Sequence, residues 1–92
     1  MKSIKEYLKE LVPLNAVSSK EDPVIKYMVE NFSRYSDNME IDVIGNVICH
    51  FPSKQSKAKK VMIFGHMDEV GFIVRNIDED GYLYIERIGG AN

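Results

Sequence analysis

The sequence predicts an α/β fold in which two N-terminal helices pack on a mixed β-sheet. Two apolar patterns with the helical period of 3.6 residues occupy the chain as far as Phe32. From Met39 the period changes to two, which is the spacing of a strand with one buried face. A continuous apolar run, Val61–Phe64, then indicates a central strand that is buried on both faces.

The first helix is predicted over residues 3–12, where Ser3 and Glu6 have the spacing of a capping box and Pro13 ends the helix. The second helix is predicted to begin with Asp22 as its N-cap and Pro23 as its first residue. The apolar side chains of the second helix recur on one face: Val24, Ile25, Met28, Val29 and Phe32. Each helix therefore offers one face for burial.

Two β-hairpins follow from the period of two and from the turn residues. The first joins strands 39–43 and 47–51 through Gly45 and Asn46, with glycine first as a type II′ turn requires. The second joins strands 71–77 and 82–88 around the acidic turn 78–81, which ends in an Asp-Gly pair. Acidic residues in that turn raise the question of calcium, but a solvated hairpin tip accounts for them better.

Titratable side chains follow the apolar run 61–64 directly. His66 and Asp68 are separated by one residue, so in an extended chain both side chains point to the same side, roughly 7 Å apart at the backbone. Ligands bind beyond the carboxyl ends of strands in open α/β sheets. The spacing allows a carboxylate to orient an imidazole whose other nitrogen holds a metal ion. The only other imidazole, His50, is expected at a hairpin edge on the surface.

Composition narrows the class of protein. The 92 residues suffice for one small domain at most, and a net charge of −2 gives no general attraction to nucleic acid or to an anionic membrane. A single cysteine, Cys49, excludes an internal disulfide framework and suits a reducing compartment. We find neither a signal peptide nor an apolar run long enough to cross a bilayer, and we expect a cytoplasmic protein.

The run from His66 to Phe72, His-Met-Asp-Glu-Val-Gly-Phe, resembles the glutamyl aminopeptidase family, which includes the tetrahedral (TET) aminopeptidases. The family resemblance extends to two later segments, Asp80-Gly81 and Ile88-Gly89-Gly90. Upstream, residues 42–47 resemble the Asp-x-x-Gly-Asn segment of that family. The likeness covers nearly the whole chain, although residues 18–21 lack the usual Ser-Gly pair and Gly65 stands where alanine is usual.

The resemblance implies a zinc-exopeptidase-like fold and a hydrolase that works with two divalent metal ions, zinc or cobalt. His66 matches the histidine that ligates one ion, and Asp68 matches the catalytic aspartate that orients this histidine. Glu69 has no metal role to transfer. The other ligands and the glutamate that acts as general base match nothing in these residues, so we expect at most one weak metal site in this chain.

The same resemblance divides the chain into two parts. Residues 1–70 correspond to an incomplete opening part of the catalytic domain, and residues 71–92 correspond to the first hairpin of an inserted β-rich dimerisation domain. We therefore expect the N-terminal fragment of a longer metallopeptidase that is inactive as 92 residues. Its expected partners are peptide substrates, the remainder of the catalytic domain and, in the full-length protein, further copies of itself.

Two other functions are alternatives to this one. The first is a non-catalytic, truncated paralogue that acts as an assembly piece by pairing through its open strand edges. The second is cleavage of glucans, a label that some relatives carry. A glycosidase needs two carboxylates that flank the scissile bond, and the His-x-Asp pattern argues against that function.

Overall fold

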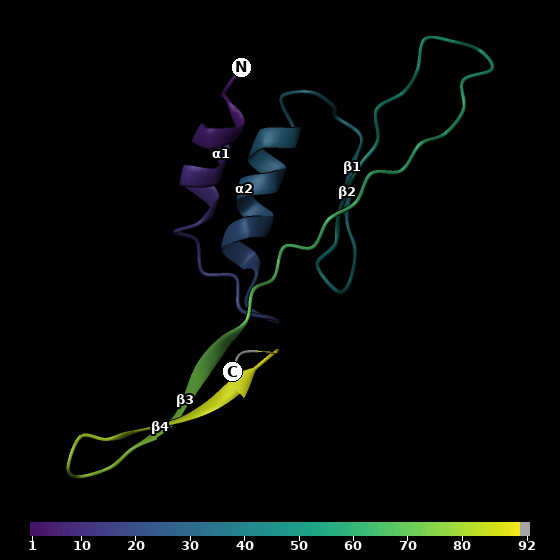
Figure 1. Cartoon of the computed structure of the whole chain (residues 1–92). Coiled ribbons are helices and arrows are strands. Elements are labelled where there is room, and N and C mark those ends of the chain that lie inside the picture. Colours follow the sequence, from purple (N-terminus) through teal and green to yellow (C-terminus); the bar gives the residue numbers. More distant parts are fainter. Residues whose placement is uncertain (91–92) are drawn as a thin grey trace.

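A computed structural model describes residues 1–90 as two helices followed by four strands, which confirms the α/β class (Figure 1). The elements are these: α1 (Ile4–Leu11), α2 (Asp22–Phe32), β1 (Met39–Ile41), β2 (Val47–Cys49), β3 (Gly71–Ile77) and β4 (Leu83–Ile88). The two helices lie side by side, and the β3–β4 hairpin extends away from them. The molecule is accordingly elongated, with extents of 66 × 28 × 23 Å. Residues 91–92 of the predicted second part lie outside the described residues.

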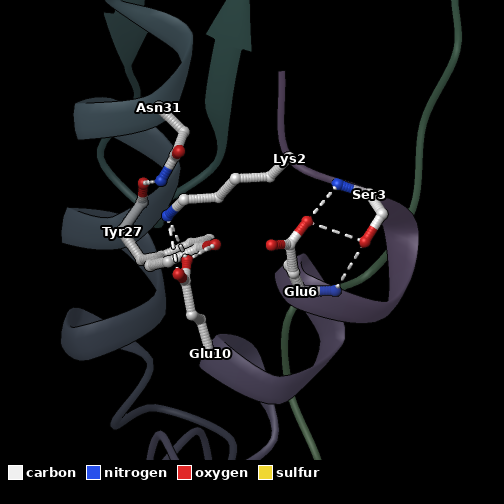
Figure 2. A network of polar contacts seen from close by, with 6 residues as sticks. All are labelled: Lys2, Ser3, Glu6, Glu10, Tyr27 and Asn31. Carbon is white, nitrogen blue, oxygen red and sulfur yellow. Dashed lines mark hydrogen bonds and ion pairs between the residues drawn. The ribbon is translucent and has the colours of Figure 1, made fainter.

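The capping box predicted for α1 is confirmed (Figure 2). The backbone N–H of Glu6 donates to Ser3 Oγ at 3.3 Å, and the carboxylate of Glu6 accepts from the backbone N–H of Ser3 at 2.7 Å. These hydrogen bonds satisfy two donors that a helix start leaves without intrahelical partners. The bonds that the backbone N–H and then the hydroxyl of Ser3 donate to the Glu6 carboxylate hold the pKa of this carboxyl below its usual value.

A polar contact joins α1 to α2 (Figure 2). The carboxylate of Glu10 accepts from Lys2 Nζ at 2.6 and 2.7 Å and from the hydroxyl of Tyr27 at 2.7 Å. Because the hydroxyl donates to a carboxylate, it holds its proton more tightly, which raises the pKa of Tyr27 to about 12. The bond to Lys2, followed by the bond to Tyr27, lowers the pKa of Glu10.

The second helix begins one residue earlier than the sequence predicts. Glu21 is the N-cap and makes no side-chain capping bond, so Asp22 lies within the first turn and Pro23 follows it. The prediction that Asp22 is the N-cap is therefore wrong. The backbone of Glu21 already has φ −82° and ψ 2°, and an acidic residue inside the first turn is favoured by the helix dipole.

The predicted mixed β-sheet is wrong. The described strands form two separate antiparallel pairs, β1 with β2 and β3 with β4. The first pair aligns Met39 with Cys49 and Ile41 with Val47, and α2 packs against β2. The only parallel pairing within residues 1–90 is an isolated bridge between Val17 and Glu69.

The predicted central strand is also absent from this structure. Val61–Phe64 has no regular structure, and its four side chains are between 82% and 94% exposed. A strand forms only beside a hydrogen-bonded neighbour, and no segment within residues 1–90 pairs with this run. Among the described residues only Ala16 and Val24 are buried, so the apolar run has nothing to pack against.

The same kind of three-residue loop closes both hairpins. For the first hairpin this differs from the predicted two-residue turn at Gly45 and Asn46. Asp42 donates its backbone N–H to the carbonyl of Asn46 at 3.1 Å, and Gly45 donates to the carbonyl of Asp42 at 3.1 Å. Gly45 has φ +91°, so glycine occupies the last of three loop positions rather than the first of two. The loop from Asp78 to Tyr82 repeats both hydrogen bonds, each at 3.1 Å, with Gly81 at φ +86°.

None of the helices in residues 1–90 combines the length and the apolar character that crossing a membrane requires.

The strands of the first hairpin are shorter than predicted, since β1 ends at Ile41 and β2 ends at Cys49. In the second hairpin, β3 has the predicted bounds, and a bulge lies between Val74 and Asn76.

The raised pKa of Tyr27 leads to a test of the contact between α1 and α2. A group whose folded pKa is raised contributes stability below its ordinary value, near 10, and loses it as the pH rises through about 12. Glu10→Gln should return the Tyr27 pKa toward 10 and remove this pH dependence, as measured by NMR titration of the tyrosine ring and by thermal unfolding. Glu30→Gln is the matched control, because Glu30 pairs only with exposed Lys26 at 3.9 Å. An unchanged Tyr27 titration in Glu10→Gln would contradict the assignment.

Candidate metal centre at His66

The side chains of His66 and Asp68 meet. Nδ1 of His66 lies 3.2 Å from Oδ1 of Asp68 and 2.9 Å from the backbone carbonyl oxygen of the same residue. The imidazole is 86% exposed and the carboxylate is 46% exposed. The imidazole is therefore oriented by its neighbour while its other edge faces solvent.

The partners of Nδ1 define the tautomer of the neutral ring. A carbonyl oxygen and a carboxylate oxygen only accept hydrogen bonds, so Nδ1 must carry the proton and donate it. Nε2 then carries the lone pair. A neutral imidazole with one nitrogen bonded to a carboxylate and a lone pair on the other is the form that ligates zinc.

The segment that carries His66 is fastened to the loop between α1 and α2 through Glu69. The backbone N–H of Glu69 donates to the carbonyl of Ala16 at 2.8 Å, and the backbone N–H of Ala16 donates to the Glu69 carboxylate at 3.4 Å. The two residues are 53 positions apart, and Ala16 is only 4% exposed. We call this pair of hydrogen bonds the Ala16–Glu69 clasp. The clasp gives Glu69 a structural role that involves no metal.

Gly71 lets the chain pass close to the clasp. A Cβ atom at this position would lie 2.6 Å from Cγ2 of Val17, which is shorter than any tolerable contact. Val17 is β-branched and rotates little, so it cannot move aside cheaply. The glycine after the His-Met-Asp-Glu-Val run is thus required by packing.

An open cavity of about 150 Å³ lies beside His66 and Asp68. Three parts of the chain line it: the start of α2, the β1–β2 loop and the segment from Gly65 to Asp68. The loop contributes Ile44, Gly45 and Asn46, which lie in the segment that resembles the Asp-x-x-Gly-Asn pattern. The cavity therefore places that segment next to the candidate metal ligand.

The donor set fits one ligand of a metal centre and not a complete centre. The chemistry of Nε2 of His66 suits zinc or cobalt, because it is a neutral imidazole nitrogen. Residues 1–90 contain no group of three or more His, Cys, Asp or Glu side chains that could hold a metal ion. Within the described part of the chain, His66 is then a single candidate ligand.

The other candidate residues lie elsewhere. His50 is exposed just after β2, and its backbone carbonyl accepts from Ser36 Oγ at 2.6 Å. At the acidic hairpin tip, the Asp78 carboxylate accepts from the backbone N–H groups of Asp80 and Tyr82 at 3.0 and 2.9 Å. These bonds fix the turn, as expected of a hairpin tip.

Comparison with known proteins assigns the family. The model of the M42 glutamyl aminopeptidase family matches residues 45–92, just over half of the chain. The chain belongs to this family. Lysyl aminopeptidase from Pyrococcus furiosus is 40% identical over 87 residues, which are 94% of this chain and 24% of that protein. The chain spans about a quarter of the length of the curated relatives it matches.

Two solved structures share the fold of this chain. An aminopeptidase from the archaeon Desulfurococcus kamchatkensis has a TM-score of 0.85 and 38% sequence identity over 95% of this chain and 24% of its own. A protein titled endoglucanase from Thermotoga maritima has a TM-score of 0.81 and 38% identity over 92% of this chain and 27% of its own.

The close approach of Gly71 to Val17 can be tested by substitution. Gly71→Ala should lower the free energy of unfolding by about 1–3 kcal/mol, because the new methyl group overpacks against Val17. Gly65→Ala should change it by less than about 0.5 kcal/mol, because no atom lies within 4 Å of a Cβ there. Urea unfolding measures both, and the double variant Gly71→Ala/Val17→Ala should recover part of the loss. Equal effects at the two glycines would contradict the close approach.

Proposed function

We propose that this M42 chain supplies His66 as a metal ligand to a co-catalytic aminopeptidase that uses two divalent ions, zinc or cobalt, and releases N-terminal residues from peptides. The observation that supports the proposal most directly is the contact of His66 Nδ1 with Asp68, at 2.9 Å to its carbonyl and 3.2 Å to its carboxylate. This contact leaves Nε2 as the ligating atom.

In this proposal Nε2 of His66 holds one ion and Asp68 acts on the imidazole rather than on the substrate. Asp68 keeps the proton on Nδ1 and raises the basicity of Nε2. When bound, a pair of ions would supply a nucleophile from water at neutral pH and Lewis-acid polarisation of the scissile carbonyl. The chain's own residues contribute ligation, orientation of the ring and the wall of the cavity beside it.

The remaining ligands and the general base are proposed to come from a further segment that corresponds to the rest of the catalytic domain. Two facts support this view. The relatives are about four times as long as the matched region, and residues 1–90 hold no cluster of three metal-ligating side chains. In the same proposal the exposed run Val61–Phe64 becomes a buried strand once that segment is present, and the complete enzyme is a cytoplasmic homo-oligomer.

A chimera tests the role of His66. This chain replaces the matched segment in the lysyl aminopeptidase of Pyrococcus furiosus, and hydrolysis of lysyl peptides is measured after chelation and after return of zinc or cobalt. Activity should depend on the added metal, and His66→Ala should lower kcat/KM more than about 100-fold. Asp68→Ala should cost about 10- to 100-fold, as expected for an outer partner of a ligating histidine. His50→Ala is the matched control and should leave kcat/KM unchanged.

The outcomes distinguish the peptidase from a non-catalytic assembly role and from glucan cleavage. Retained activity in His66→Ala would remove this residue from the metal centre. A folded, metal-free and inactive chimera would favour a non-catalytic assembly role. Because one structural relative is titled endoglucanase, the chimera is also assayed on a soluble β-glucan. Glucan hydrolysis that survives chelation would overturn the peptidase proposal.

A further inference from the structure

Asn46 occupies an unusual position in the β1–β2 loop. It lines the cavity beside His66 and Asp68, together with Gly45. Its backbone N–H and its side-chain Nδ2 both donate to the carboxylate of Asp42, at 2.9 and 2.7 Å. One carboxylate therefore fixes both the loop and the amide side chain.

The chemistry of Asp42 determines which end of the amide faces it. The carboxylate also accepts from the backbone N–H of Ile44 at 3.0 Å, and these hydrogen bonds, chiefly the one from the Asn46 side chain, keep the pKa of Asp42 below its usual value. An ionised carboxylate only accepts hydrogen bonds. The NH₂ group of Asn46 must therefore point at Asp42, and the carbonyl oxygen Oδ1 must point away from it.

The loop itself does not need this side chain. The second hairpin closes an equivalent loop in which Asp78 accepts from the backbone N–H of Tyr82 at 2.9 Å, just as Asp42 accepts from Asn46. Tyr82 gives Asp78 no side-chain hydrogen bond, and the hydroxyl of Tyr84 approaches the second oxygen at 3.4 Å. The backbone N–H is thus enough to close such a loop, so closing the loop does not require the side-chain amide of Asn46.

We propose that Asn46 is a substrate-binding residue whose Oδ1 accepts a hydrogen bond from a main-chain N–H of a peptide bound beside His66, and that Asp42 is the positioning residue that fixes this amide. The inference rests on the proposed peptidase function and deepens it. An acceptor of fixed orientation next to the metal ligand aligns an extended peptide without taking part in the chemistry.

The kinetic test uses the same chimera with lysyl-alanyl-alanine as the substrate. Asn46→Ala should raise KM about fivefold and leave kcat within about twofold, because it removes one neutral hydrogen bond made equally in the ground state and the transition state. Asp42→Asn should raise KM in the same direction, since either end of the new amide can face Asn46. Asp78→Asn alters the equivalent loop away from His66, and it should leave KM unchanged.

Ester analogues identify the donor in the substrate. Each main-chain N–H of the peptide is replaced in turn by an ester oxygen, and KM is measured in the parent chimera and in Asn46→Ala. For one replacement only, the ester should raise KM in the parent but not in Asn46→Ala. Equal sensitivity of the parent and Asn46→Ala to every ester would overturn the hydrogen bond. A rise in KM for Asp78→Asn as large as that for Asp42→Asn would overturn the positioning role.

A measurement on the 92-residue chain separates this inference from the proposed function. In ¹⁵N-labelled protein the side-chain NH₂ of Asn46 should exchange more slowly than it does in the urea-unfolded chain. Asp42→Asn should speed this exchange, and Asp78→Asn should not. Unchanged exchange in Asp42→Asn would overturn the orienting role of Asp42 whether or not the chimera is active. An inactive chimera with the expected exchange would instead remove the peptidase function and, with it, Asn46 as a substrate-binding residue.

Discussion

The Ala16–Glu69 clasp is the constraint on which the arrangement of this chain depends. It joins residues 53 positions apart, and it is the point where the His66 segment meets the helical part within residues 1–90. The carbonyl and the N–H of Ala16 are both engaged, and Ala16 is one of two buried residues in the described chain. Because few side chains in residues 1–90 are buried, the two hydrogen bonds of the clasp determine where the candidate metal ligand lies relative to α2.

Three acidic residues share one physical task, and one of them, Asp68, lines the cavity. Asp42 accepts from an amide, Asp68 from an imidazole and Glu69 from a backbone N–H. In each case an acceptor-only group selects the orientation or tautomer of the donor opposite it. Acidic side chains here orient other groups. In the proposed function this leaves Nε2 of His66 to bind a cation and Oδ1 of Asn46 to accept a hydrogen bond from the substrate.

Local structure could be predicted from the sequence because its causes lie within a few residues. The capping box of Ser3 and Glu6 and the strand bounds of β3 follow from spacing alone. The two-residue turn predicted at Gly45 is wrong because the segment has an Asp-x-x-Gly pattern, in which the carboxylate of Asp42 accepts the loop N–H groups. That pattern occurs twice and could have revealed the loop.

Features that depend on distant partners could not be predicted from the sequence. Val61–Phe64 has the composition of a buried strand, but a strand also needs neighbours, and residues 1–90 provide none. At the site, the contact of His66 with Asp68 follows from their spacing, whereas their roles in catalysis stay predictions. The clasp at Ala16 and the approach of Asn46 to the cavity join segments far apart in sequence, so spacing gave no sign of them.

The most direct test of the central claim is the tautomer of the two histidine rings, read from long-range ¹H–¹⁵N correlations at a pH where both rings are neutral. His50, with its exposed ring, is the internal reference, and His50→Asn assigns the signals. We predict that His66 is protonated at Nδ1, in contact with Asp68, and that zinc shifts the signal of its Nε2. A His66 ring protonated at Nε2 would contradict the claim that the contact with Asp68 prepares this imidazole to bind a metal ion.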